Sequence, residues 1–281
     1  FRVFKSDESK IFLVIFLLST TNFILLERFS TDLLIFTFTS LIIFFRHNII
    51  KLLLIFIGTI LKFYPFFLLI IFIKDKKFFL ISAVSLILFL YFFYLDEISS
   101  VNENLIEMAY FTAYGSRTMF KALYFLSENY NFILNQTNID FFRDIFISLI
   151  IIYSILLVVL SYFFSQSKSS NILSEADQFF LIGSSIYIGT FIFASNADYR
   201  LIFLIFTIPY ILEIKNIVIK YILNFCIIIS INSFLFQFGE PLSISFYMRA
   251  IFIFGCKFFI LSLFLIYIGS ILKKLNFLKI N

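Results

Sequence analysis

The sequence predicts an all-α integral membrane protein, and three observations lead to this fold class. Of the 281 residues, 62% are hydrophobic and only 14% are charged, whereas soluble domains contain about 45–50% apolar and about 25% charged residues. The apolar residues form continuous runs without the period-two alternation of barrel strands, which indicates helices. Polar residues gather in short breaks between the runs. This composition excludes a soluble enzyme, a nucleic-acid-binding protein and a disordered chain.

Eight apolar segments are predicted to span the membrane, because a spanning helix needs about 20 mostly apolar residues. In chain order they are Ile11–Leu26, Asp32–Phe45, Phe78–Leu95, Phe141–Phe164, Gln178–Ser195, Leu201–Ile214, Ile219–Phe238 and Ala250–Leu272. Together with the hairpin described next, they give about ten helical segments in a single transmembrane domain that covers residues 1–281.

The segment Asn48–Ile73 is compatible with one kinked span or with a hairpin of two short helices, because it contains Lys62 and Pro65 near its middle. Proline disfavours helix at the preceding residue, here Tyr64. With a cytoplasmic N-terminus, the hairpin places most lysines and arginines inside, whereas a single span divides them almost equally between the two sides. The positive-inside rule therefore favours a hairpin with its tip at the sequence LKFYP.

The same topology predicts that residues 96–140 form an external loop with an interfacial helix. The chain begins with Phe1 in a charged stretch, and we expect that an N-terminal part of the protein precedes it. Cys226 and Cys256 lie in apolar runs without the spacing of a ligand set, so the sequence predicts no metal site.

Charged and tyrosine residues in three turns are predicted to meet at the outer face. Some of them have simpler interpretations, since Lys62 could reach the headgroups and Asp198 could cap a helix. Arginine and lysine at headgroup level, without a carboxylate cluster for a metal, suit the phosphate monoester of a lipid. The three turns contain Glu27, Arg28 and Asp32; Lys62 and Tyr64; and Asp198, Tyr199 and Arg200.

These turns carry a resemblance to a known family. The segments ERFSTDLLIF, LKFYPFFLLIIFIKDKK and NADYRLIFLIFTIPYIL occur in the order and approximate spacing of the GT-C membrane glycosyltransferases. The sequence is similar to glycosyltransferase family 87, the polyprenyl-phosphate-mannose-dependent mannosyltransferase-like proteins. The family pattern reads Glu-Arg-Gly-Asn-x-Asp, Lys-x-Tyr-Pro and Asp-Tyr-Arg-Leu. The resemblance covers Leu26–Leu212, with Phe29–Ser30 in place of Gly-Asn.

The resemblance implies an inverting transferase that needs no metal or other cofactor. It would move mannose or a similar sugar from a polyprenyl-phosphate donor to a lipid-linked or glycan acceptor, at the outer face of the cytoplasmic membrane. Lys62 and Arg200 would bind the donor phosphate. The catalytic base is expected upstream of Phe1, with Asp198 and Asp32 as the remaining candidates. The site would be lined by Glu27, Arg28, Asp32, Tyr64, Asp198 and Tyr199.

Three other functions stay open at this stage. An O-antigen polymerase or ligase would use a lipid diphosphate donor and commonly has its largest loop late in the chain, whereas the largest predicted loop here is central. A transporter would have charges in the middle of its spans and internal repeats. A non-catalytic membrane partner of a glycan-assembly complex is the third alternative.

Overall fold

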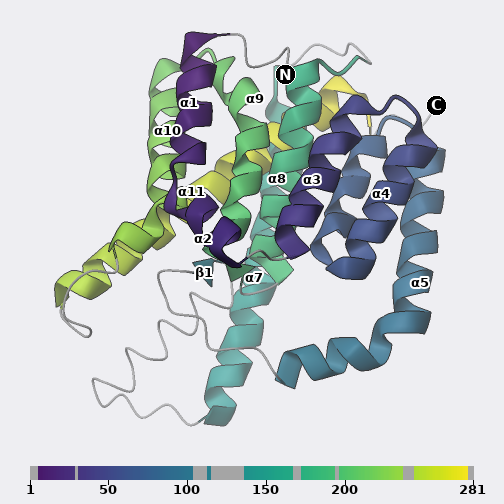
Figure 1. Cartoon of the computed structure of the whole chain (residues 1–281), viewed down its shortest axis with the longest axis horizontal. Coiled ribbons are helices and arrows are strands. Elements are labelled where there is room, and N and C mark those ends of the chain that lie inside the picture. The colour runs from purple at the N-terminus through teal and green to yellow at the C-terminus, as the bar shows by residue number, and fades with distance from the viewer. Residues whose placement is uncertain are drawn as a thin grey trace.

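The computed structural model describes residues 6–28, 31–103, 113–114, 136–166, 172–193, 196–236 and 244–277. These residues form helices joined by turns, together with one short pair of strands (Figure 1). The first half contains α1 (Asp7–Leu17), α2 (Thr20–Arg28), α3 (Thr31–Phe44), α4 (Asn48–Leu61), the 3₁₀ helix η1 (Tyr64–Phe72) and α5 (Lys76–Glu103). The second half contains α7 (Gln136–Phe164), α8 (Glu175–Phe193), the 3₁₀ helix η2 (Asp198–Thr207), α9 (Ile208–Leu212), α10 (Ile217–Ile231), the 3₁₀ helix η3 (Ser233–Phe236) and α11 (Ile244–Lys274).

Helix α8 lies at the centre of the described structure (Figure 1), and most of its length is buried. Both η1 and η2 pack against it. At Gly183 a Cβ atom would lie 2.8 Å from the carbonyl oxygen of Phe203 in η2. This position therefore requires glycine, because only glycine allows η2 to pack so closely against α8.

Helices α7 and α11 pack side by side and run parallel. Near their middle, the hydroxyls of Tyr153 and Ser262 lie 2.9 Å apart. Near their C-terminal ends, Lys273 Nζ donates to the carbonyl oxygen of Phe163 at 3.0 Å. Two contacts in the same order along both helices define this parallel orientation.

One small sheet joins distant parts of the chain. Strand β1 (Ala113–Tyr114) pairs antiparallel with β2 (Asn196–Ala197), and Ala113 lies opposite Ala197. The first strand belongs to the predicted external loop, and the second leads directly into η2. Apart from β1, the residues of this loop between Glu103 and Gln136 lie outside the described part of the chain, and so does the segment predicted to form the interfacial helix. Residues 96–103 continue α5, and residues 136–140 begin α7.

The prediction of eight membrane spans is wrong. Among the described residues, only Asp144–Phe164 and Met248–Lys274 are long and apolar enough to cross a membrane, or three segments if the bent pair α1–α2 counts as one span. The helices α3, α4 and α10 contain 14, 14 and 15 residues. At 1.5 Å per residue they reach about 21–23 Å, which is shorter than a hydrocarbon core of about 30 Å.

The error arose because an apolar run indicates that a helix is removed from water, but does not show whether protein or lipid surrounds it. Runs of 10–14 apolar residues are more often buried core helices or re-entrant segments than spans. Helix α8, predicted as a span over Gln178–Ser195, is packed inside the protein and carries Glu175 and Asp177 in its first turn. The predicted span Ile11–Leu26 is two helices that meet at an angle of 47°.

Candidate functional site

Four residues predicted for the site lie in contact around one buried carboxylate. We name this group the Asp32 cluster, and it contains Asp32, Lys62, Tyr64 and Arg200. Lys62 Nζ donates to Asp32 Oδ2. The Tyr64 hydroxyl donates to Oδ1 at 2.7 Å, and Arg200 Nε donates to the same oxygen at 3.3 Å. The Arg200 guanidinium also lies over the Tyr64 ring, 5.1 Å from its centre.

The local structure of three elements explains this convergence. Asp32 lies in the first turn of α3, where the positive end of the helix dipole favours a carboxylate. Helix α4 ends at Leu61, and Lys62 follows with an extended backbone (φ −156°, ψ 141°). Pro65 has the fixed φ that suits a helix start, so η1 begins at Tyr64, directly after the break. The break therefore turns the Lys62 and Tyr64 side chains toward the start of α3.

Exposure distinguishes the carboxylate from its two cations. The Asp32 side chain is 1% exposed, whereas those of Lys62 and Arg200 are 25% and 17% exposed. A molecule that approaches the cluster therefore meets the ammonium and the guanidinium before it meets the carboxylate. Asp32 offsets the repulsion between the two like charges, so they are held close together before any ligand binds.

The charges of the cluster also control its protonation. Burial raises the pKa of the Asp32 carboxyl, but the charges of Arg200 and Lys62 and the hydrogen bonds from Lys62 and Tyr64 outweigh burial. The pKa of Asp32 therefore lies below its ordinary value. Burial lowers the pKa of the Lys62 ammonium, and the like charge of Arg200 lowers it further, against the effect of Asp32. The charged form of Asp32 is stabilised more than that of Lys62, because two cations and a hydroxyl donor surround the carboxylate.

Two further predicted residues with described side chains, Glu27 and Asp198, are not part of this cluster. Glu27 is exposed in the last turn of α2 and makes no contact with the cluster in the described part of the chain. Arg28 is the last residue of α2, and Tyr199 is the second residue of η2. The side chains of Arg28 and Tyr199 lie outside the described residues.

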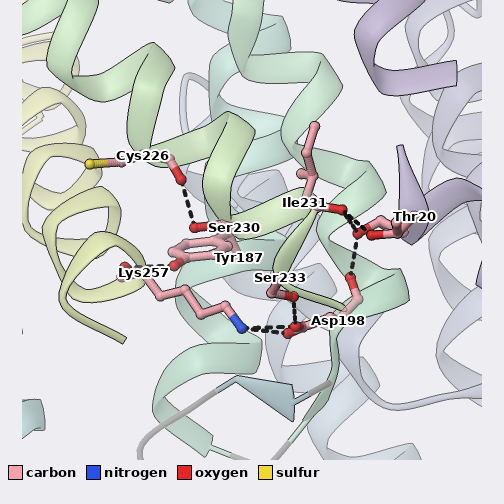
Figure 2. A network of polar contacts seen from close by, with 9 residues as sticks. Thr20, Tyr187, Asp198, Cys226, Ser230, Ile231, Ser233 and Lys257 are labelled. Carbon is pink, nitrogen blue, oxygen red and sulfur yellow. Dashed lines mark hydrogen bonds and ion pairs between the residues drawn. The ribbon is translucent and has the colours of Figure 1, made fainter. Parts of the chain in front are cut away.

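Asp198 belongs to a second group of charges, which the sequence analysis did not predict. Figure 2 shows Lys257 of α11 and Ser233 of η3 pointing toward the Asp198 carboxylate. Lys257 Nζ lies 2.8 Å from Oδ1 and 2.9 Å from Oδ2, and the Ser233 hydroxyl donates to Oδ2. We name Asp198, Ser233 and Lys257 the Asp198 cluster. The side chains of its two charged members are only 4% and 1% exposed.

One sequence signal could have identified Lys257. It is the single charged residue in the apolar segment Ala250–Leu272, and an ionisable residue at membrane depth is by default a candidate functional residue. No comparable signal exists for Ser233, because serine is common in helices and its partner is 35 positions away.

The Asp32 cluster has the chemistry of an anion site. A guanidinium carries five N–H donors and an ammonium three. Two such groups held close together can donate hydrogen bonds to the oxygens of one phosphate. Among the described residues, no group of three or more histidines, cysteines and carboxylates is placed to hold a metal ion.

In the part of the chain that the structure describes, the fold and the site define a helical protein with two or three candidate membrane spans and a partly exposed pair of cations. No known protein family, curated protein or solved structure matches the chain. The resemblance to glycosyltransferase family 87 therefore rests on the three sequence motifs and stays a prediction.

Proposed function

We propose that the protein is a membrane glycosyltransferase that takes its sugar from a polyprenyl-phosphate donor. The observation that carries the proposal is the Asp32 cluster, in which one buried carboxylate holds Lys62 and Arg200 side by side. The motifs that suggested the family supply both cations, the carboxylate and the tyrosine of this cluster. The phosphate of a lipid-linked sugar, a diester that becomes the monoester polyprenyl phosphate when the sugar leaves, is the ligand that best fits two cations in a protein with apolar helices.

In the proposed reaction, Lys62 and Arg200 bind the phosphate of the donor. The acceptor hydroxyl gives its proton to a general base and attacks the anomeric carbon, while the bond to the phosphate oxygen breaks and negative charge grows on the leaving polyprenyl phosphate. Fixed cations stabilise such charge without reorganising, which is an electrostatic contribution that needs no cofactor. The sugar would be mannose or a similar hexose or pentose, transferred with inversion to a lipid-linked or glycan acceptor.

The two carboxylates that were candidates for the catalytic base have other roles in this proposal. Asp32 accepts hydrogen bonds from two cations and a hydroxyl, and its lowered pKa makes it a weak base. Asp198 is buried against Lys257. We therefore assign Asp32 to holding the donor-binding cations and not to proton transfer.

The membrane setting of the proposal rests on the candidate spans and on the apolar surface. Many large apolar side chains are exposed on the described helices, for example Phe92, Phe164 and Ile217 at 73%, 80% and 61%. Soluble monomers rarely expose such side chains in contiguous patches. We place the protein in the cytoplasmic membrane with the Asp32 cluster at its outer face. The strand pair β1–β2, which ends directly before η2, brings part of the predicted external loop next to this site as an acceptor-side cover.

The test measures binding of a polyprenyl phosphate to the full chain reconstituted in neutral lipid vesicles. We expect Lys62→Ala and Arg200→Ala each to weaken binding by about ten- to hundredfold, because each removes a charge-assisted contact worth roughly 1.5–3 kcal/mol. The matched control is Lys220→Ala. It removes another lysine in an ion pair, with Glu8 at 3.1 Å and a side chain 16% exposed, and it should bind like the wild type.

Two further ligands separate the phosphate from the hydrocarbon chain and from the competing function. The corresponding polyprenol, which has the same chain without phosphate, should bind weakly and equally to all variants. A polyprenyl diphosphate that bound much more tightly than the monophosphate would favour the polymerase or ligase alternative. Wild-type affinity for the monophosphate in both Lys62→Ala and Arg200→Ala would refute the proposed site.

A further inference from the structure

The Asp198 cluster places a complete ion pair inside the protein, beside the proposed donor site but not in it. Lys257 extends from α11 and meets both oxygens of Asp198 at the start of η2 (Figure 2). Its own backbone carbonyl accepts a hydrogen bond of 2.6 Å from the buried Tyr187 of α8. The lysine is thus fixed at its backbone by one helix and at its ammonium by another.

Such a pair contributes little to stability by itself. Removing two charges from water costs several kcal/mol per ion, and their attraction often only offsets that cost. Replacement of a buried ion pair by apolar groups of similar size is frequently neutral or even stabilising. The more informative property of this pair is geometric, because it fixes one specific turn of η2 to one specific position on α11.

That turn has its other polar groups fixed as well. The Ser233 hydroxyl donates to the Asp198 carboxylate. The Thr21 hydroxyl donates to the backbone carbonyl of Ile231 at 2.7 Å, and the backbone carbonyl of Asp198 lies 3.4 Å from the same hydroxyl. The start of η2 is therefore held from α11, η3 and α2, in addition to its apolar packing on α8.

Arg200 belongs to the same turn. A 3₁₀ helix has three residues per turn, so successive side chains are rotated by about 120°. Asp198 and Arg200, two positions apart, therefore leave the helix in different directions, and in the structure Asp198 meets α11 while Arg200 meets Asp32 of α3. Any rotation or unwinding of this turn that frees Asp198 also moves Arg200.

We propose that Lys257 is a positioning residue, which acts through Asp198 to hold the Arg200 guanidinium in the Asp32 cluster. The inference rests on the proposed function in one respect, since it assigns the purpose of this positioning to binding of the donor phosphate. Lys257 itself does not contact the donor. Its side chain is 1% exposed, compared with 17% for Arg200.

The main variant for the test is the double replacement Asp198→Asn with Lys257→Met. Lys257→Met alone leaves a buried carboxylate without its cation, which is strongly destabilising and threatens folding. The double variant removes both charges and keeps an oxygen that can accept from Ser233. We expect its unfolding in detergent to match the wild type, while its affinity for polyprenyl phosphate falls about ten- to hundredfold, as displacements of about 1 Å in a site can produce.

The readout that separates positioning from a general structural effect is a pair of mutant cycles. In an Arg200→Ala background the double replacement should cause no further loss of binding, because the group that it positions is already absent. In a Lys62→Ala background it should still cause most of its loss, because the Arg200 guanidinium that it positions is still present. Equal losses in both backgrounds, or wild-type affinity of the double variant, would overturn the inference.

Hydrogen–deuterium exchange tests the positioning without any ligand. We expect the double variant to exchange faster in peptides that cover residues 196–204 and to match the wild type in α7 and α10. Unchanged exchange in η2, or faster exchange throughout the protein, would contradict the positioning role. If the wild type binds no polyprenyl phosphate, the proposed function fails, and the exchange result still decides whether Lys257 holds the first turn of η2.

Discussion

The contact between α7 and α11, which contain the two candidate spans, depends on Gly269. A Cβ atom at this position would lie 1.8 Å from Ser161 Oγ and 2.5 Å from the carbonyl oxygen of Val158 in α7. The hydroxyl could rotate away, but the carbonyl belongs to a helical backbone and has no such freedom. Gly255 is a matched control in the same helix, because a Cβ atom there meets nothing within 4 Å.

The two glycines predict opposite effects of the same substitution. Alanine is more favourable than glycine in a helix by about 1 kcal/mol, and forcing an extra carbon into a packed contact costs about 1–3 kcal/mol. Because the contact at Gly269 includes a backbone atom, we take the upper end of this range. Gly269→Ala should then be destabilised by about 2 kcal/mol, and Gly255→Ala stabilised by about 1 kcal/mol.

Reversible unfolding in mixed micelles, followed by circular dichroism, measures both free energies. The two variants should differ by about 3 kcal/mol, and adding Ser161→Ala to Gly269→Ala should recover only part of the loss, because the Val158 carbonyl remains. Equal stability of Gly269→Ala and Gly255→Ala would show that Gly269 does not face α7. The parallel packing of the two candidate spans would then be wrong.

Two further predictions concern the Asp32 cluster. Because the folded-state pKa of Asp32 lies below its ordinary value of 3.8, the cluster stabilises the fold fully above about pH 4, and this stability is lost as the pH falls through the folded-state pKa. Between pH 6 and pH 3 the unfolding free energy should therefore fall more steeply in the wild type than in Asp32→Asn, and parallel profiles would contradict the ion pairs. Tyr64→Phe keeps the ring under Arg200 but removes the 2.7 Å bond to a charged group, so it should cost about 1.5–3 kcal/mol. Tyr153→Phe, which removes a contact with the neutral Ser262, should cost only about 0.5–1.5 kcal/mol, and a reversed order of the two losses would argue against a charged Asp32.

The sequence allowed the members of the Asp32 cluster to be named, because charged residues in short breaks of an apolar chain are few and therefore informative. It could not show which of them touch. Arg200 and Asp32 are 168 positions apart, and their contact depends on how η2 and α3 pack. The sequence-based grouping of Asp198 with these residues overlooked the rotation between neighbouring positions of η2, which directs Asp198 to Lys257 instead.

The number of spans was not predictable from hydropathy alone, although some residues carried a warning. The run Ser19-Thr20-Thr21-Asn22 interrupts the first predicted span, and hydroxyl and amide side chains bond to nearby backbone and compete with helical bonds. In the structure, Thr20 and Thr21 donate to the carbonyl oxygen of Ile231 in α10, and the two helices α1 and α2 bend at this place. An apolar run with a polar cluster inside it is better interpreted as two helices.

The two clusters show why burial is a better guide to role than charge. Both contain a carboxylate paired with at least one cation, and both include the first turn of η2. In the Asp198 cluster the lysine is as buried as its partner, which agrees with the proposed role of holding the first turn of η2. In the Asp32 cluster the carboxylate is buried while Lys62 and Arg200 remain partly exposed. The same turn of η2 therefore has a buried ion pair on one side and a partly exposed cation on the other, and substitutions of Lys257 should change where Arg200 lies without changing its charge.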